Sequence, residues 1–314
     1  MLEGDLIGNF ILAPLAGITD IAFRRICSEQ GADLVFTEMV SCDGLIYNFQ
    51  KTSEYLKTYE KENKIGVQLF GHKVENIQKA IEILNQYDFF CIDFNAGCPV
   101  KKVTRHGNGA ALLKDPAHLE KIMTTIKSTS NHPVSLKVRK GYYKNDDITP
   151  RLVDMANDLD LAFLTIHGRT KAEMFSGISD WSVIKEAAVR SKIPIVGNGD
   201  IFSYSDYEEK AFSQGIKRVM IGRGCLGNPF LFKELKNKGS ISITNKEKME
   251  TGLKHFSYLL QEKPEKRAVF EMRKHWAWYS KGMNNGSLFR KEIFIIEKVD
   301  QVIETVKKFI DKIQ

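Results

Sequence analysis

Short apolar runs alternate with segments of helical spacing along most of this 314-residue chain. This alternation constrains the fold most, because strands separated by helices build parallel sheets. Eight runs are predicted to be strands: Ile11–Ala13, Leu34–Glu38, Ile65–Phe70, Phe89–Asn95, Val134–Arg139, Ala162–His167, Pro194–Gly197 and Arg218–Gly222. Helices are predicted between them at 19–30, 73–86, 115–130, 148–159, 181–190 and 203–213, whereas 41–60 is unclear. The pattern predicts a (β/α)8 TIM barrel, with a doubly wound sheet as the alternative.

The strand pattern stops near residue 245. The remaining segments have helical spacing: Lys246–Glu262, Glu265–Gly282 and Phe289–Ile313, the last with a break near 297–300. One apolar face of the last segment is formed by Val302, Val306, Phe309 and Ile313. We therefore expect a barrel at 1–240 and a small C-terminal helical domain at 241–314, joined through the polar stretch Lys233–Asn245.

Positive charge is concentrated in the tail. The whole chain has a net charge of +7, and residues 241–314 hold 15 Lys and Arg against 10 Asp and Glu. A basic domain favours a polyanionic partner, and a solvated lysine-rich surface is the alternative.

Cysteine usage and hydropathy bear on the compartment. The cysteines are scattered and include no CxxC pair, which argues against a disulfide framework or a structural metal site. No run approaches the ~18 apolar residues of a membrane span. Met1–Asp5 contains no basic leader. We expect a cytoplasmic protein that acts away from membranes, as a monomer and without a protein partner.

The end of an apolar run places Cys98 just after a predicted strand. The apolar run Phe89–Phe94 is followed by Asn95, Gly97 and Pro99. Pro99 disfavours a helical backbone at Cys98 and holds its thiol on an extended turn. The basic residues Lys101, Lys102 and Arg105 come next. A thiol beside a basic loop suits a reaction on an anionic substrate, and a buried structural cysteine is the alternative.

Polar residues recur near the predicted strand ends, where barrel enzymes place their sites. Lys137 and Arg139 share one face of a strand, because side chains at i and i+2 point the same way. His167 ends the next strand, with Arg169 just beyond, and Gln68 lies inside an earlier one. The structural alternative is an edge strand or a salt bridge for Lys137 and Arg139, and hydrogen-bonded core positions for Gln68 and His167.

Glycine-rich turns follow the last two predicted strands. They contain Gly197-Asn198-Gly199-Asp200-Ile201 and Gly222-Arg223-Gly224. Loops at these positions of a TIM barrel often bind phosphate, and an arginine adds charge. The first strand ends in Ala13–Asp20, whose small residues would let a flat ring lie over the barrel mouth. Ordinary tight turns are the alternative for all three segments.

The segment Glu265–Gly282 combines an apolar face with basic stripes. Its apolar face is formed by Val269, Met272, Trp276 and Tyr279. One stripe contains Arg267, Lys274 and Lys281, and a second contains Lys266 and Arg273. Such stripes suit a nucleic-acid backbone, and a solvated helix face is the alternative.

Together these segments resemble the tRNA-dihydrouridine synthases, and the bacterial B-type branch most. The resemblance rests on Ala13–Asp20, Asn95–Pro99 with Lys102-Val103, Lys137–Arg139, His167–Thr170, Gly197–Ile201, Gly222–Gly224 and Glu271–Gly282. It covers nearly the whole chain. Leu15 departs from the family, which commonly has Met there; the exchange is apolar and puts little in doubt.

The resemblance implies an FMN-dependent enzyme that reduces uridine in tRNA, with NADPH or NADH as electron donor and no metal. It implies FMN contacts from Pro14, Leu15, Ala16, Gln68, Lys137, His167, Asn198, Gly199, Asp200, Gly222 and Arg223. It gives Cys98 the role of proton donor. We expect substrate contacts from Asn95, Lys101, Lys102, Arg105, Arg139, Arg169, Arg267, Arg273, Lys274 and Lys281.

The expected reaction adds a hydride to C6 of uracil and a proton to C5. The flavin supplies the hydride and Cys98 supplies the proton, since a thiol with an ordinary pKa is largely protonated at neutral pH. The uridine must leave its stack to reach the flavin. Two alternatives remain: an FMN barrel oxidoreductase of the dihydroorotate-dehydrogenase kind, and a non-catalytic RNA-binding protein on a retired barrel.

Overall fold

The computed structural model describes residues 7–59, 62 and 64–313, and within them nine parallel strands form one sheet. The strands are β1 (Phe10–Leu12), β2 (Val35–Phe36), β3 (Val40–Ser41), β4 (Ile65–Phe70), β5 (Cys91–Ala96), β6 (Val134–Arg139), β7 (Phe163–His167), β8 (Ile195–Asn198) and β9 (Val219–Ile221). Their order is β1-β9-β8-β7-β6-β5-β4-β2, with β3 also paired to β4. A bridge between Ile11 and Leu34 joins the ends of this order, so the sheet closes into a barrel. The prediction of a TIM barrel is confirmed, and the doubly wound alternative is excluded.

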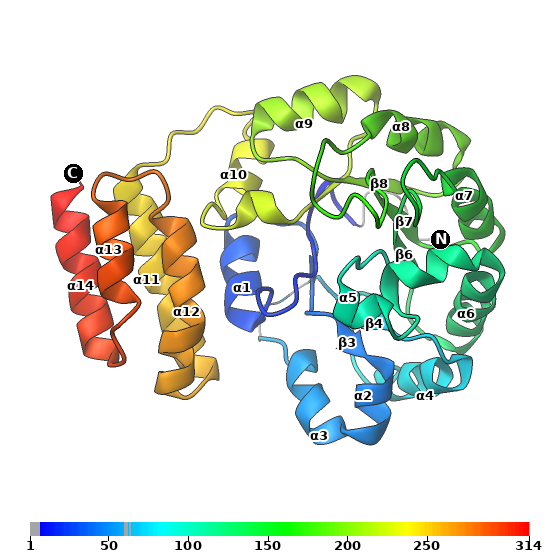
Figure 1. Cartoon of the computed structure of the whole chain (residues 1–314), viewed down its shortest axis with the longest axis horizontal. Helices are drawn as coiled ribbons and strands as arrows, with labels where there is room; N and C mark the ends of the chain where they lie inside the picture. The colour runs from blue at the N-terminus through cyan, green and yellow to red at the C-terminus, as the bar shows by residue number, and fades with distance from the viewer. Residues whose placement is uncertain (1–6, 60–61, 63, 314) are drawn as a thin grey trace.

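Helices surround the strands (Figure 1). They are α1 (Ile21–Glu29), α2 (Cys42–Tyr47), α3 (Phe49–Thr52), α4 (Val74–Leu84), α5 (Lys101–Thr104), α6 (Pro116–Thr129), α7 (Thr149–Asp158), α8 (Trp181–Arg190), α9 (Tyr204–Lys210) and α10 (Leu231–Lys236). Helix α6 begins as the sequence predicts, because Asp115 accepts a hydrogen bond from the His118 N–H at 3.1 Å and Pro116 needs no partner for its nitrogen. The predicted strand at 34–38 is the short β2, and the next strand, β3, was not predicted.

Strand periodicity divides the apolar residues of the barrel between two cores. Ile11 and Leu34 lie in a cluster that also contains Phe163 and Met220. The next residues along β1 and β2, including Leu12, belong to the larger cluster shared with the surrounding helices. Successive side chains of a strand point to opposite faces, and here both faces are buried. The strands therefore need nearly continuous apolar runs.

Up to residue 313, where the described part of the chain ends, the tail is formed by α11 (Asn245–Glu262), α12 (Glu265–Tyr279), α13 (Gly286–Ile293) and α14 (Val299–Lys312). The expected break near 297–300 separates α13 from α14. The predicted apolar face of α12 is buried in the tail core, where Trp276 packs edge-to-face against Phe256 and Phe289. A capping box of Thr244 and Glu247 starts α11.

The tail packs against the barrel through α1, as Figure 1 shows. Phe23 and Cys27 of α1 belong to the barrel core, whereas Ala22 and Ile26 belong to the tail core. Polar contacts hold both ends of the helix. The Lys263 ammonium lies 2.7 Å from the Asp20 carboxylate, and Tyr258 donates a hydrogen bond to Glu29 at 2.7 Å. The two cores are therefore in contact along one shared helix.

No helix in the described ranges combines the length and apolar character that a membrane crossing requires. The expectation about a leader at Met1–Asp5 falls outside the described residues.

Candidate active site

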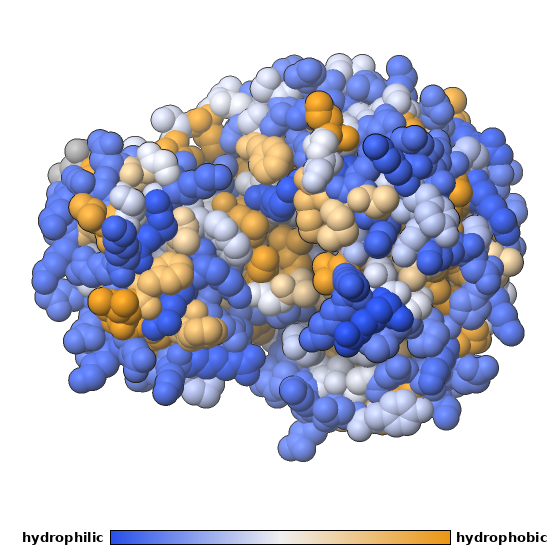
Figure 2. Space-filling view, in the orientation of Figure 1, coloured by the Kyte–Doolittle hydropathy of each residue, from blue (hydrophilic) through white to orange (hydrophobic). Residues whose placement is uncertain are grey.

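A cavity of about 1090 Å³, including its open mouth, lies at the carboxyl ends of the barrel strands. Figure 2 shows it as a hollow near the centre of the face, with apolar residues at its base. Among the residues predicted for cofactor, substrate or catalysis, it is lined by Pro14, Leu15, Ala16, Asn95, Cys98, Lys137, Arg139, His167, Asn198, Gly199, Asp200, Gly222 and Arg223. The barrel therefore brings together residues that are separated by up to about 200 positions in the sequence.

The loop after β1 forms an apolar part of the cavity wall. The Leu15 carbonyl accepts hydrogen bonds from the Ile18 and Thr19 N–H groups at 2.9 and 3.0 Å. The Thr19 hydroxyl accepts one from the Leu15 N–H at 2.9 Å. These bonds fold the loop tightly, so Pro14, Leu15 and Ala16 present small apolar surface to the cavity.

Cys98 sits on a turn that Asn95 holds from inside the barrel. The Asn95 Oδ1 accepts hydrogen bonds from the N–H groups of Gly97 and Cys98 at 3.2 and 2.9 Å. The Cys98 carbonyl accepts a further bond from the Ala110 N–H at 3.0 Å. The Cys98 side chain lines the cavity although the residue is only 9% exposed. Sequence reasoning thus placed the thiol correctly at a strand end.

Burial raises the pKa of the Cys98 thiol, and this effect exceeds the opposing influence of a backbone N–H and the cations of Arg139 and Lys137. Lys101, Lys102 and Arg105 do not counteract this effect, because they are exposed to solvent, which screens their charges. The thiol is therefore protonated at neutral pH and can act as an acid.

Gln68 does not line the cavity. Its amide is fully buried, donates to Asp93 at 2.6 Å and accepts from Asn95 at 2.8 Å. The geometry favours an indirect role in place of the expected flavin contact.

Lys137 is the cation at the base of the cavity. It lies beside Asn198, and its ammonium donates to the Asn198 Oδ1 at 3.0 Å. Asn198 is itself fixed, since its amide nitrogen donates to the Met220 carbonyl at 2.6 Å. Burial, with a smaller contribution from Arg139, lowers the pKa of Lys137 to about 8. Its remaining N–H groups have no acceptor among the described residues and are available to a ligand.

His167 is a neutral imidazole. Burial, followed by the charges of Arg139, Lys137 and other arginines, keeps its pKa well below the ordinary value. Its Nδ1 accepts a hydrogen bond from the Arg169 N–H at 3.1 Å, so the hydrogen resides on Nε2. The ring therefore presents a donor, not a charge, to the cavity.

Arg139 connects two loops at the mouth. Its guanidinium donates from Nε to the Gly97 carbonyl at 3.0 Å and from Nη1 to the Thr170 carbonyl at 2.7 Å. Its Nη2 has no acceptor among the described residues, and the side chain borders the cavity. Arg139 can therefore hold the Cys98 loop and also contact a substrate.

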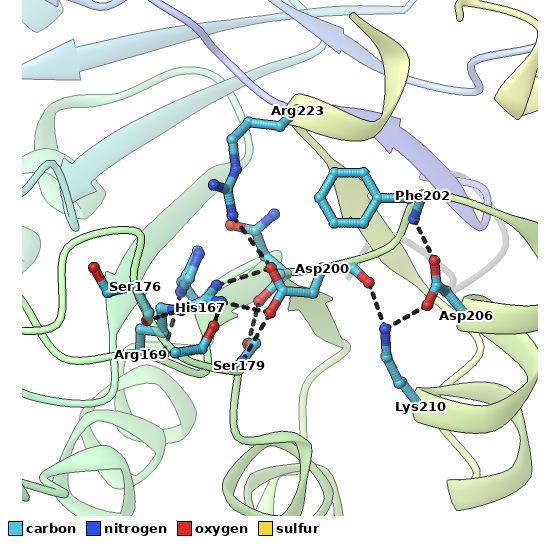
Figure 3. A network of polar contacts seen from close by, with 12 residues as sticks. His167, Arg169, Ser176, Ser179, Asp200, Phe202, Asp206, Lys210 and Arg223 are labelled. Atoms are coloured by element: carbon cyan, nitrogen blue, oxygen red, sulfur yellow. Dashed lines mark hydrogen bonds and ion pairs between the residues drawn. The ribbon is translucent and has the colours of Figure 1, made fainter. Parts of the chain in front are cut away.

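Arg169 is buried, at 1% exposure, and its donors are used within the protein. It forms a bidentate ion pair with Asp200, with distances of 3.0 and 2.6 Å, and donates to the Ser176 carbonyl at 2.9 Å (Figure 3). Asp200 also accepts from the Ser179 N–H at 2.9 Å and pairs with Arg223 at 3.2 Å. Arg169 thus holds a loop, and the expected substrate contact is not favoured by this geometry.

The two glycine turns meet at the Arg223 side of the cavity. Gly199 has a φ of +130°, and a Cβ there would lie 2.3 Å from the Ser179 hydroxyl, so only glycine fits. A Cβ on Gly224 would lie 2.1 Å from the Ile201 carbonyl oxygen. The close approach of these backbones, together with the partly exposed Arg223 guanidinium, gives this part of the cavity the groups that could bind an anion.

Sequence reasoning missed two aromatic residues of the site. Phe175 and Phe202 line the cavity, and the Arg223 guanidinium lies 5.3 and 6.0 Å from their ring centroids. Phe175 also lies 5.6 Å from the Arg139 guanidinium. Each is a single aromatic residue in a polar loop after a predicted strand, which is a weak signal in one sequence.

The predicted RNA-contact residues lie in two places. Lys101, Lys102 and Arg105 are exposed at α5, beside the cavity, where Figure 2 shows a strongly hydrophilic group. On α12, Arg267 pairs with Glu271 at 2.7 Å and the Lys274 ammonium donates to the Gly17 carbonyl.

The other two predicted tRNA-contact residues of the tail, Arg273 and Lys281, differ in whether their charged groups have a partner within the protein. Arg273 donates to the Ile296 carbonyl at 3.1 Å. Lys281 is exposed, with no partner among the described residues. The predicted basic residues therefore divide into two groups. Arg267, Arg273 and Lys274 contact other groups of the tail or the barrel, whereas Lys281 is exposed without a partner among the described residues.

Comparison with known proteins agrees with this geometry. The profile of the dihydrouridine synthase (Dus) family matches residues 11–314. The chain is 35% identical over 292 residues to the tRNA-dihydrouridine synthase B of Pasteurella multocida (strain Pm70), covering 91% of this chain and 88% of that protein. It is 31% identical over 313 residues to the probable tRNA-dihydrouridine synthase of Rickettsia conorii (strain ATCC VR-613 / Malish 7), covering 97% and 94%.

A solved structure supports the fold alone. Histamine dehydrogenase from Rhizobium sp. 4-9 superposes with a TM-score of 0.55 at 14% identity, over 77% of this chain and 49% of that longer one. The expectation of an oxidoreductase is confirmed by the family match, which spans nearly the whole chain. The chain therefore belongs to the dihydrouridine synthase family.

Proposed function

We propose that this chain is an FMN-dependent tRNA-dihydrouridine synthase that reduces the C5=C6 bond of uridines in tRNA with electrons from NADPH or NADH. The observation that supports it most is the position of Cys98, a protonated thiol that lines the same cavity as Lys137 and the glycine turns. Family membership supplies the reaction class, and relatives from P. multocida and R. conorii are named for this activity.

The cavity residues fit FMN. The cavity combines an apolar wall, inward-facing donors and glycine turns beside an arginine, which suit the ring, its polar edge and the phosphate of a flavin mononucleotide. Lys137 and His167 would hold the polar edge of the ring, because they offer donors into the cavity. Pro14, Leu15 and Ala16 would form the apolar wall against the ring. The phosphate end would be held by Asn198, Gly199, Gly222 and Arg223.

Asp200 would act on the phosphate indirectly. A carboxylate in contact with a phosphate would repel it, whereas here the carboxylate oxygens pair with Arg169 and Arg223. Asp200 therefore orients the Arg223 guanidinium, and Gln68 likewise acts through Asn95.

Bound FMN, once reduced, would supply a hydride to C6 of the uracil. Cys98 would donate the proton to C5, because burial keeps its thiol protonated until the proton is needed. The thiolate that remains would be stabilised by a backbone N–H and by the cations of Arg139 and Lys137, each of which favours the ionised sulfur. A proton from solvent would then restore the thiol. The site thus combines a protonated ground state with a stabilised conjugate base.

The basic surfaces would bind tRNA. Lys101, Lys102 and Arg105 flank the cavity mouth and would contact phosphates next to a flipped-out uridine. Arg139, through its free Nη2, would position the uracil. Arg267, Arg273, Lys274 and Lys281 would bind the tRNA body at a distance, as phosphate contacts without sequence information. Asn95 would contribute by shaping the Cys98 loop, since both ends of its amide are already bonded.

The test uses the reduced flavoprotein without oxygen. Mixed with a tRNA transcript that lacks dihydrouridine, it should be reoxidised in step with dihydrouridine formation, whereas a fully modified tRNA should leave it reduced. Reoxidation by orotate but not by tRNA would favour the small-molecule oxidoreductase. A purified protein that is colourless and takes up no FMN would favour the non-catalytic RNA-binding protein.

A further inference from the structure

A chain of buried polar side chains runs beneath the Cys98 loop. Asp93 of β5 accepts hydrogen bonds from the Ser135 hydroxyl and the Gln68 amide, both at 2.6 Å. The Gln68 Oε1 then accepts from the Asn95 amide at 2.8 Å. Asp93, Gln68 and Ser135 are fully buried, so no solvent competes for these bonds.

The chain ends on the backbone that carries the thiol. The Asn95 Oδ1 accepts from the N–H groups of Gly97 and Cys98, while the Asn95 amide nitrogen faces Gln68. Each amide therefore has its donor end toward Asp93 and its acceptor end toward Cys98. Reversing either amide would set donor against donor and leave buried groups unpaired.

Asp93 is the member that sets this direction. An ionised carboxylate has no hydrogen to donate, so Gln68 can face it only with its Nε2. Burial raises the pKa of Asp93 to about 6, against the hydrogen bonds from Ser135 and Gln68 and the charge of Lys137. Above neutral pH the group is therefore mainly an acceptor. Asp93 does not line the cavity, so it acts through its neighbours and not on a ligand.

We propose that Asp93 is a positioning residue for Cys98: through Gln68 and Asn95 it fixes the loop conformation in which the thiol faces the cavity. The inference rests on the proposed role of Cys98 as the acid, but its physical content is the placement of a sulfur atom. That placement can be measured without tRNA.

A pair of substitutions tests the direction of the bonds. In Gln68→Glu, two buried carboxylates would face each other at the Asp93 contact, which costs free energy and disturbs Asn95. In the double variant Asp93→Asn with Gln68→Glu, the new amide at position 93 donates to the new carboxylate, which still accepts from Asn95. The double variant should therefore recover what the single variant loses.

The direct readout is the alkylation rate of Cys98 by iodoacetamide in the FMN-loaded protein. Cys27, Cys42, Cys91 and Cys225 are fully buried, so modification of the folded protein reports on Cys98, with Cys98→Ala as the blank. We expect Gln68→Glu to alkylate about tenfold faster and to lose about 100-fold in turnover, as small misplacements of reacting groups do. The double variant should return to within about threefold of the parent in both measurements.

Three results would overturn the proposal. One is a double variant as impaired as Gln68→Glu. Another is a Gln68→Glu protein with unchanged alkylation, whatever its melting temperature. If Gln68→Glu does not fold, Gln68→Met removes the bonds without adding charge, and an unaltered alkylation rate in that variant would be the third. Because alkylation needs no tRNA, a failure of uridine reduction would leave this test intact, so the two failures are distinguishable.

Discussion

The cavity and the tail helix α12 both gather cations, yet they use them differently. Arg139, which lines the cavity, and Arg169, which lies outside its lining, are both buried and donate to carbonyls and a carboxylate of the barrel. On α12, Lys281 is exposed, and Arg267 has only a solvent-exposed ion pair. A buried guanidinium must be paired and therefore fixes the groups around it. An exposed cation exchanges partners at little cost and can bind a polyanion.

This contrast implies that the two regions are separable in function. Changes at the cavity should alter turnover, cofactor affinity or stability while tRNA affinity is kept. Changes on α12 should alter tRNA affinity and its salt dependence while the chemistry is kept. If a cavity variant lost tRNA affinity, or an α12 variant lost turnover, the difference in burial would not correspond to a difference in function.

The largest effect is expected for Cys98→Ala. Removal of a general acid should lower the turnover number by about 10²- to 10⁴-fold, while the tRNA dissociation constant stays within about twofold. Single-turnover assays and tRNA binding at fixed salt measure the two quantities. The buried Cys225→Ala serves as the matched control and should keep its turnover. Equal activity in the Cys98 variant would remove the thiol from the mechanism.

Asp200→Asn should have the next largest effect, on stability. The pKa of Asp200 is held below its usual value, since Arg169, Ser179 and Arg223 together outweigh the effect of burial. Loss of the charge leaves Arg169 buried without its counter-ion, which should cost about 3 kcal/mol of unfolding free energy. FMN affinity should also fall, because Arg223 loses its anchor.

Denaturant titration and flavin binding measure this prediction. The matched control is Asp154→Asn, which breaks an exposed pair with Arg190 and should cost less than about 1 kcal/mol. Similar losses in the two variants would contradict the distinction between buried and exposed cations.

The basic stripe of α12 should have an intermediate effect. Replacing Arg267, Lys274 and Lys281 together by Ala should weaken tRNA binding by about 30-fold and lower the slope of log affinity against log salt by about 2 to 3. The matched control removes the same charge at Lys298, Lys307 and Lys312, which are exposed elsewhere in the tail. Binding measured from low to physiological salt separates the two. Equal slopes in both variants would mean that the tail attracts tRNA only through its net charge.

The smallest expected effect is a pH dependence of FMN affinity. Lys137 has a pKa of about 8 in the folded protein, below its ordinary value of 10.5. The ammonium should bind FMN better than the amine, so affinity should fall by about fourfold between pH 7 and 8.5 as the proton is lost. The same shift means that charged Lys137 destabilises the empty site at low pH and that this penalty fades above pH 8. Flavin fluorescence titration of Lys137→Met should give a flatter profile, and an equally steep one would assign the titration to another group.

The sequence was a good guide wherever a pattern depends on one segment. Periodicity predicted the barrel, the break before α14 and the buried face of α12. The turn at Pro99 placed Cys98 at a strand end. These features follow from local rules of strand alternation, helical spacing and proline geometry.

The features that could not be predicted from the sequence are contacts between residues that are far apart in the chain. Arg169 and Asp200 are 31 positions apart, and only the closed barrel shows that they pair and that the arginine is buried. Gln68 was predicted to contact the flavin, and its hydrogen bonds to Asp93 and Asn95, which favour an indirect role, could not be predicted from one strand. The raised pKa of Cys98 could not be predicted for the same reason, because burial is a property of the assembled fold.

Helix α1 has a consequence for how such proteins can diverge. One side of it, at Phe23, completes the barrel, and the other, at Ala22 and Ile26, completes the tail. A tail exchanged from a related protein would not pack well, because the residues of α1 that it contacts are complementary to the present tail. The barrel and the tail are therefore expected to evolve together. A substitution in α11 at its contact with α1 must be compensated within α1, a nine-residue helix that also packs against the barrel.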